Sequence, residues 1–190
     1  DTILIARPLY HCAVLTGEFL TALVKGAGIR FCSEAFNPPV IPKLIREYGI
    51  TVFCGTPTLM GLMVRFVKNG ETLPLRHIAV SGEGMSREAG LRIADSLSNT
   101  KIYHVYGLTE ACPRVSYLPP ELFGSFPDCV GIPLKSVRLR ITKKSGMAAV
   151  KGEKGLLYVS GDNVMAGYYG EPEKTADILK DGWLCTGDIA

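Results

Sequence analysis

Five consecutive residues, Tyr106, Gly107, Leu108, Thr109 and Glu110, include the side chains best suited to chemistry in this chain. The ring of Tyr106 offers a flat face to a base or an acyl group, and Gly107 lets a ligand approach the main chain. The hydroxyl of Thr109 can donate a hydrogen bond to a phosphate, and the carboxylate of Glu110 can hold Mg²⁺. This combination predicts a nucleotide site.

The segments around these residues predict the elements that position them. Residues 101–106, KIYHVY, are a β-branched and aromatic run that stops at Gly107, as is typical of a buried strand entering a turn. In open α/β sheets, ligands bind at the carboxyl ends of the strands. A second turn, SGEGMS at 81–86, follows another predicted strand, and Ser86 is expected to cap the next helix. Taken alone, this turn is more often an ordinary connection from strand to helix.

Strands and helices alternate through the first part of the chain. The pattern predicts strands at 2–6, 29–32, 50–54, 76–81 and 101–106, and helices at about 17–25, 40–48, 58–68 and 86–97. Such alternation indicates a mostly parallel sheet with right-handed crossovers. Later runs with a period of two, at 137–142, 155–161 and 183–187, are typical of antiparallel strands. We therefore expect an α/β fold, with an α/β subdomain over 1–124 and a small antiparallel β subdomain over 125–190.

The composition argues against several classes of protein. The chain has 190 residues, of which 47% are hydrophobic, and this suffices for a sizeable core. Its net charge of +3 is scattered, so no nucleic-acid partner is expected. No apolar run approaches the ~20 residues of a membrane span. The six cysteines lie far apart, without the spacing of a zinc site or a disulfide framework, which predicts a reducing, cytoplasmic setting.

Three segments of the chain resemble motifs of the adenylate-forming, or AMP-binding, superfamily, and they occur along the chain in the order that the family has. This superfamily includes acyl-CoA synthetases, aryl-CoA ligases, luciferases and nonribosomal peptide adenylation domains. Residues 106–110 match its Tyr-Gly-x-Thr-Glu motif, and residues 81–86 resemble its adenine-contacting loop, with a mild departure at the first position, Ser81. Residues 155–190 match a long family signature nearly position for position. Most of that signature is expected to be architectural, with Tyr168 and Trp183 serving in packing.

The resemblance implies roles at the adenosine part of ATP. The turn residues Gly82, Glu83, Gly84 and Met85 would border the adenine. Asp188 would accept hydrogen bonds from both ribose hydroxyls, for which the two oxygens of a carboxylate are suited.

His104 stands where the family usually has an Asn or Gln that contacts the adenine amino group. Its imidazole can make that bond, with donor and acceptor roles set by the tautomer, but a structural histidine in a strand is an equally open interpretation. Tyr106, Gly107 and Thr109 complete the implied ATP-binding set. Thr109 and Glu110 would be the catalytic residues, with Glu110 as the Mg²⁺ ligand.

The resemblance also implies a pocket for the acyl group. Tyr10 and His11 match the aromatic residue or histidine that lines and gates this pocket, and Gly107, Leu108 and Cys112 would contribute further walls. On the residues alone, a surface histidine after a strand is the commoner case. Relatives that activate amino acids carry an Asp directly after the aromatic residue, and none follows Tyr10. A carboxylic acid without an α-amino group is therefore expected.

The implied reaction has two steps. A carboxylate attacks the α-phosphate of MgATP to give an acyl-adenylate and pyrophosphate, and a thiol of CoA or of a carrier-protein phosphopantetheine then displaces AMP. Mg²⁺ on Glu110 and a donor from Thr109 suit the neutralisation of charge that this chemistry requires.

Two parts that the resemblance leads one to expect, a phosphate loop and a carboxy-terminal domain with an adenylation lysine, are not recognised in this sequence. We therefore expect a fragment of an AMP-forming acid–thiol ligase that is inactive by itself. A fragment of a nonribosomal peptide adenylation domain and a non-catalytic nucleotide-binding module are the alternatives. The first is supported by the Gly-Glu pair at 82–83 but weakened by the missing substrate Asp.

Overall fold

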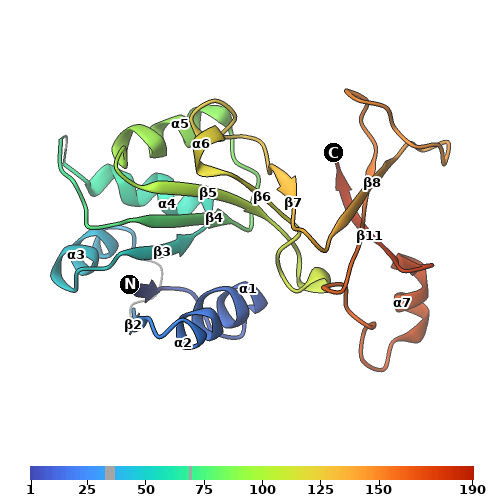
Figure 1. Ribbon diagram of the computed structural model, residues 1–190, viewed down its shortest axis with the longest axis horizontal. Coiled ribbons are helices and arrows are strands. Elements are labelled where there is room, and N and C mark those ends of the chain that lie inside the picture. The colour runs from blue at the N-terminus through green and yellow to red at the C-terminus, as the bar shows by residue number, and fades with distance from the viewer. Residues whose placement is uncertain (33–36, 69) are drawn as a thin grey trace. The chain divides into compact units, whose positions relative to one another are not determined.

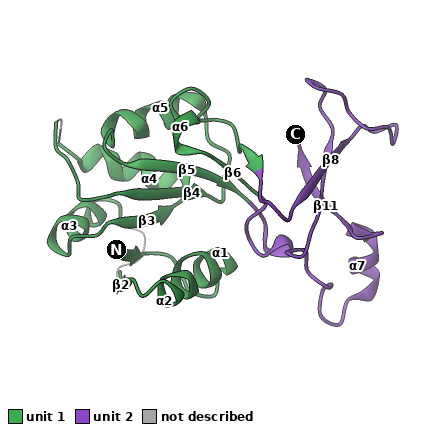
Figure 2. Cartoon of the chain, viewed as in Figure 1, with its two compact units in different colours: residues 1–106, 116–132 green, residues 107–115, 133–190 purple. Residues whose placement is uncertain are grey.

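The computed structural model describes residues 1–32, 37–68 and 70–190, and its contacts divide the chain into two compact units (Figure 2). Unit 1 comprises residues 1–106 and 116–132, and unit 2 comprises residues 107–115 and 133–190. The loop that carries Thr109 and Glu110 is therefore part of unit 2. The domain boundary expected near residue 124 stays a prediction.

A seven-stranded, mostly parallel sheet has the order β2-β1-β3-β4-β5-β6-β7. Its strands are β1 (Thr2–Ile5), β2 (Gly28–Phe31), β3 (Val52–Gly55), β4 (His77–Ser81), β5 (Lys101–Tyr106), β6 (Ser116–Leu118) and β7 (Ile132–Pro133). The first five pair in parallel and β6 runs antiparallel to β5, which confirms the predicted α/β class. Because parallel strands end at a common edge, the carboxyl ends of β1, β3, β4 and β5 lie along one edge of the sheet (Figure 1).

Helices pack on both faces of the sheet in unit 1 (Figure 1). One face is covered by α3 (Val40–Glu47), α4 (Pro57–Met63), the 3-10 turn η2 (Val64–Phe66), α5 (Arg87–Ser96) and α6 (Pro120–Phe123). Side chains such as Ile45, Phe53, Met60 and Ile93 are fully buried there. In the part of the chain that the structure describes, no helix is long and apolar enough to cross a membrane.

The first helical segment lies on the other face and begins earlier than the predicted 17–25. It consists of α1 (Cys12–Val14), a π-helix η1 (Leu15–Leu20) and α2 (Thr21–Val24). His11 precedes α1 without a side-chain cap, so no capping signal marked this start. Glu18 of the π-helix is fully buried, and its carboxylate accepts a bond of 2.5 Å from Arg7. This ion pair ties the helix to the segment that follows β1.

Unit 2 contains a four-stranded antiparallel sheet with the order β10-β11-β9-β8. Its strands are β8 (Arg138–Thr142), β9 (Leu156–Ser160), β10 (Leu179–Lys180) and β11 (Trp183–Ile189). Leu157, Val159 and Leu184 are buried on one face, as the alternating pattern predicts. The unit also contains the 3-10 turn η3 (Thr109–Ala111) and α7 (Pro172–Ile178). The second, smaller antiparallel sheet is thus confirmed.

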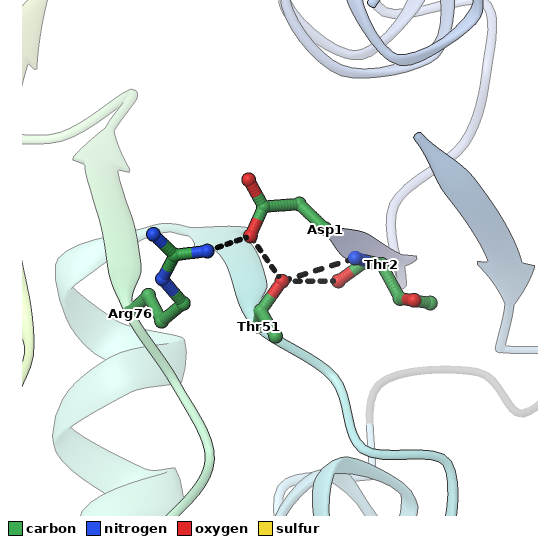
Figure 3. Close-up of polar contacts among 4 residues, drawn as sticks. All are labelled: Asp1, Thr2, Thr51 and Arg76. Carbon is green, nitrogen blue, oxygen red and sulfur yellow. Dashed lines mark hydrogen bonds and ion pairs between the residues drawn. The ribbon is translucent and has the colours of Figure 1, made fainter. Parts of the chain in front are cut away.

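Polar contacts close the amino-terminal edge of the parallel sheet (Figure 3). The amide of Thr2 donates to Thr51 Oγ1 at 3.0 Å, and that hydroxyl donates to Asp1 Oδ1 at 2.9 Å. Arg76 Nη1 donates to the same carboxylate oxygen at 3.0 Å. These bonds link the starts of β1, β3 and β4, so the protein's own polar groups bind one another at the edge opposite the predicted ligand site.

Candidate functional site

Unit 1 places the predicted adenine turn directly after β4. Gly82 has a φ of +99°, a left-handed conformation that favours glycine, and Gly84 is exposed. The carboxylate of Glu83 accepts a bond of 2.6 Å from Thr58 Oγ1, which ties the turn to the first residues of α4. The side chain of Met85 is 6% exposed and packs in the core. A contact between Met85 and a nucleotide would therefore come from its main chain.

The same edge of unit 1 carries Tyr106. It is the half-buried last residue of β5, and the neighbouring strand β4 ends at Ser81, which pairs with Val105. Adjacent parallel strands therefore bring the turn at 82–85 and Tyr106 to neighbouring positions on one sheet edge. This is where an open α/β sheet binds ligands.

His104 of β5 is only 2% exposed. Its Nδ1 lies 3.1 Å from the carbonyl oxygen of Pro127 and 2.9 Å from that of Cys129, so the geometry is that of an N–H donating to both. Burial lowers the pKa of His104, which favours the neutral ring. These contacts support the structural interpretation of this histidine, and an adenine contact stays a prediction.

Tyr10 and His11 lie beyond the carboxyl end of β1. Their rings stack with centroids 5.2 Å apart, and Tyr10 is 84% exposed. The amide of His11 donates to the carbonyl of Pro8 at 3.2 Å, which closes a turn. Both side chains thus follow a strand end on the edge that also carries Tyr106, and their role in an acyl pocket stays a prediction.

The loop 107–115 of unit 2 folds closely on itself. A Cβ added to Gly107 would lie 1.6 Å from the carbonyl oxygen of Pro113, so this position requires glycine whatever ligand binds nearby. After the 3-10 turn, Cys112 has a φ of +48° and its amide donates to Thr109 O at 3.2 Å. Cys112 and Thr109 are exposed, whereas Leu108 is half-buried.

A segment of the family-like signature holds this loop from within the same unit. The amide of Met165 donates to the carbonyl oxygen of Glu110 at 2.8 Å. Asn163 Nδ2 donates to the carbonyl oxygens of Ala111 at 2.9 Å and Arg114 at 3.1 Å. We call residues 163–168 the strap, because they fix the main chain of the Thr109–Glu110 turn.

The strap also reaches the carboxylate of Glu110. The hydroxyl of Tyr168 donates to Glu110 Oε1 at 2.7 Å, and this hydrogen bond raises the pKa of the phenol. The sequence interpretation assigned Tyr168 to packing and missed this contact. The two residues are 58 positions apart, so no local pattern could reveal it.

Asp188 lies in an irregular stretch of β11. The pairing register with β9 shifts between Cys185 and Ile189, and Gly187 has a φ of +81°. Thr186 Oγ1 accepts a bond of 3.1 Å from the amide of Asp188 and donates to Leu157 O at 3.0 Å. Such bulges redirect side chains, and here the bulge presents the exposed Asp188.

The carboxylate of Glu110 is chemically suited to Mg²⁺, and its role as a ligand of that ion stays a prediction. Among the described residues, no group of three or more His, Cys, Asp or Glu side chains could hold a metal ion. Mg²⁺ is usually bound by one or two carboxylates together with substrate phosphates. A single carboxylate fixed by a hydrogen bond, next to the exposed residue Thr109, agrees with that pattern.

Comparison with known proteins gives the family. A family model described as AMP-binding enzyme matches residues 1–169. The chain belongs to the AMP-binding enzymes. Relatives of the chain include a feruloyl-CoA synthase of an Amycolatopsis species, 32% identical over 189 residues, which cover 98% of this chain and 38% of the relative. A long-chain-fatty-acid–CoA ligase of Yersinia pestis is 32% identical over 197 residues, which cover 100% of this chain and 34% of the relative.

The chain of this AMP-binding enzyme therefore spans little more than a third of the length of these two relatives. Solved structures agree with the fold. A double mutant of o-succinylbenzoate CoA synthetase from Bacillus subtilis, bound with its product analogue, matches with a TM-score of 0.88 at 24% identity, covering 100% of this chain and 38% of the other. The same enzyme in complex with ATP and magnesium ion matches with a TM-score of 0.86 at 24% identity, covering 100% of this chain and 38% of the other.

Proposed function

We propose that this AMP-binding protein is an ATP-dependent acid–thiol ligase that activates a carboxylic acid and passes it to a thiol. The observation that carries the proposal is the Thr109–Glu110 turn, whose carboxylate is held by Tyr168 at 2.7 Å, in a chain matched to the family over residues 1–169. Relatives named as CoA synthases and CoA ligases support CoA as the acceptor, with a carrier phosphopantetheine as the alternative.

Each of these residues would contact a different part of MgATP. Glu110 holds Mg²⁺ through its carboxylate, and Thr109 donates a hydrogen bond to a phosphate oxygen. Bound Mg²⁺ supplies positive charge that neutralises the phosphate oxygens. Asp188 accepts hydrogen bonds from the ribose hydroxyls, and Tyr106 offers its ring to the adenine together with the main chain of residues 82–85.

The acyl group would be bound by the aromatic and small residues assigned to its pocket. Tyr10 and His11 gate the entry, and Gly107, Leu108 and Cys112 contribute to the wall. Since no Asp follows Tyr10 to pair with an ammonium group, we propose a fatty or aryl acid as the substrate class.

ATP–pyrophosphate exchange on the complete protein, with a panel of fatty, aryl and amino acids, tests this function. We expect exchange with one class of acid and a loss of ~10²–10³-fold in Glu110→Gln, because a neutral amide binds Mg²⁺ more weakly and the phosphate oxygens lose the positive charge that neutralises them. Asp188→Ala should also lose exchange. Glu173→Gln changes an exposed carboxylate in the first turn of α7 and should leave the rate unchanged.

Two outcomes would contradict the proposal. Exchange with amino acids alone would favour a peptide adenylation domain. A folded protein that binds ATP but exchanges with no acid would be a non-catalytic nucleotide-binding module.

A further inference from the structure

The contact between Tyr168 and Glu110 joins two residues that the sequence placed in different roles. A glutamate side chain has three rotatable torsions, so a half-exposed carboxylate samples many orientations unless a partner holds it. The bond of 2.7 Å from Tyr168 restricts one oxygen of Glu110. Because a carboxylate has about four lone-pair sites on two oxygens, one donated bond leaves acceptor capacity for a cation.

Tyr168 is itself anchored and can transmit that restriction. The amide of Tyr168 donates to Thr175 Oγ1 at 2.9 Å. The hydroxyl of Thr175 in turn donates to the carbonyl oxygen of Glu171, at the start of α7, at 2.8 Å. Gly167 packs against this threonine, because an added Cβ would lie 2.8 Å from Thr175 Cγ2. The phenol therefore extends from a main chain that α7 holds in place.

The other end of the contact is equally fixed. The strap binds the main chain of Glu110 through the amide of Met165 at 2.8 Å, and it binds the following residues through Asn163. One short segment thus sets the position of the Glu110 backbone and the direction of its carboxylate. The next residue, Tyr169, is fully exposed, whereas Tyr168 is 38% exposed, so the two neighbouring tyrosines differ in their surroundings.

We propose that Tyr168 is a positioning residue for Mg²⁺ binding, whose hydroxyl orients the carboxylate of Glu110 toward the metal ion of MgATP. This inference rests on the proposed function and extends it to a residue outside the motif at 106–110. Groups that orient metal-binding side chains typically contribute ten- to a hundredfold in metal affinity.

Calorimetric ATP binding to the complete protein, with Mg²⁺ or with EDTA and without any acid, tests the proposal without turnover. Tyr168→Phe removes only the hydroxyl, and Tyr169→Phe is the matched control on the neighbouring exposed ring. We expect Tyr168→Phe to reduce the Mg²⁺-dependent gain in ATP affinity by about tenfold or more and to leave the affinity in EDTA unchanged. Tyr169→Phe should behave as the wild type.

A double-mutant cycle with Glu110→Gln identifies the route of the effect. If Tyr168 acts through the carboxylate, Tyr168→Phe should cause no further loss of the Mg²⁺-dependent gain in the Glu110→Gln background. Additive losses would overturn the proposal. An increased Mg²⁺-dependent gain in Tyr168→Phe would also overturn it, because the hydroxyl would then compete with the metal ion.

A folding defect is distinguished from a positioning role by a second pair of variants. Thr175→Val removes the hydroxyl that holds the Tyr168 amide, and Thr175→Ser retains it. We expect a reduced Mg²⁺-dependent gain in Thr175→Val and recovery in Thr175→Ser, with far-UV circular dichroism unchanged in both. Equal gains in Thr175→Val and Thr175→Ser would contradict the proposal even if Tyr168→Phe unfolds.

The proposed function and this inference can fail separately. A wild-type protein whose ATP affinity does not depend on Mg²⁺ contradicts the magnesium role of Glu110, and the role of Tyr168 fails with it. A normal dependence in the wild type, with equal gains in Tyr168→Phe and Tyr169→Phe, overturns only the role of Tyr168.

Discussion

Gly107 illustrates how a motif residue can be required by the chain's own packing. The sequence assigned it to the close approach of a ligand, whereas the structure places its α-carbon against the carbonyl of Pro113. The two requirements are compatible, but only the second is independent of nucleotide. The motif therefore contains two kinds of residue. Glu110 contributes a carboxylate that can take part in chemistry, and Gly107 allows the loop that carries this carboxylate to fold.

Replacement of Gly107 by alanine should destabilise unit 2. The added Cβ would lie 1.6 Å from Pro113 O, so the loop must shift, at a cost of about 1–3 kcal/mol. Gly61 in α4 is the matched control, because an added Cβ meets nothing within 4 Å. Gly61→Ala should be neutral or stabilise by about 0.5–1 kcal/mol through helix propensity. Urea unfolding measures both; equal stabilities would contradict the close approach.

Helix α5 connects the predicted adenine turn to the body of unit 1. It begins directly after the turn, and Ser86 Oγ accepts a bond of 3.2 Å from the amide of Ala89, which confirms the predicted cap. Other helices begin with proline in the first turn, as α6 does at Pro120 and α7 at Pro172. Proline has no N–H to donate, and this costs nothing in the first turn of a helix, where the N–H has no partner within the helix.

Ser86→Ala should destabilise unit 1 by about 1 kcal/mol, because one amide at the start of α5 loses its acceptor. Ser96→Ala is the control at the other end of the same helix. Its hydroxyl donates to Arg92 O at 2.9 Å, a bond within the helix whose loss should have little effect. Thermal unfolding of the two variants gives the comparison. A cap that contributes nothing would leave their midpoints equal.

The two sheets differ in how the chain pairs within each unit. In unit 1, β1, β3 and β4 are paired on both sides and β2 lies at an edge. In unit 2, β9 and β11 are paired on both sides, with β8 and β10 at the edges. Across the whole molecule, backbone amides in strands paired on both sides should be better protected from hydrogen exchange than those in edge strands. Central buried strands open only when their whole unit unfolds.

Hydrogen exchange should therefore be slowest in β3 and β4 of unit 1 and in β9 of unit 2. Burial supports this order, because Phe53, Ile78 and Val159 are fully buried, whereas Phe31 of the edge strand β2 is 51% exposed. Mass-spectrometric exchange on the folded protein measures each strand, with β2 and β10 as internal references. Exchange of β9 as fast as that of β10 would contradict the assigned order of the second sheet.

The sequence by itself determined the alternation of strands and helices, the mostly parallel sheet and the smaller antiparallel one. These follow from local periodicity and from capping residues such as Ser86, which act over one or two turns of chain. It also indicated the motif at 106–110 and its position after a strand, because β-branched residues and glycine have strong local preferences.

Only the tertiary structure decided the contacts that give these residues their surroundings. His104 meets the carbonyls of Pro127 and Cys129, and Glu110 meets the hydroxyl of Tyr168, 58 positions away. A hydrogen bond between distant residues depends on how strands and loops are brought together, and no spacing in the sequence encodes that distance. The chemistry of Glu110 could be predicted from its type, whereas the orientation of its carboxylate required the fold.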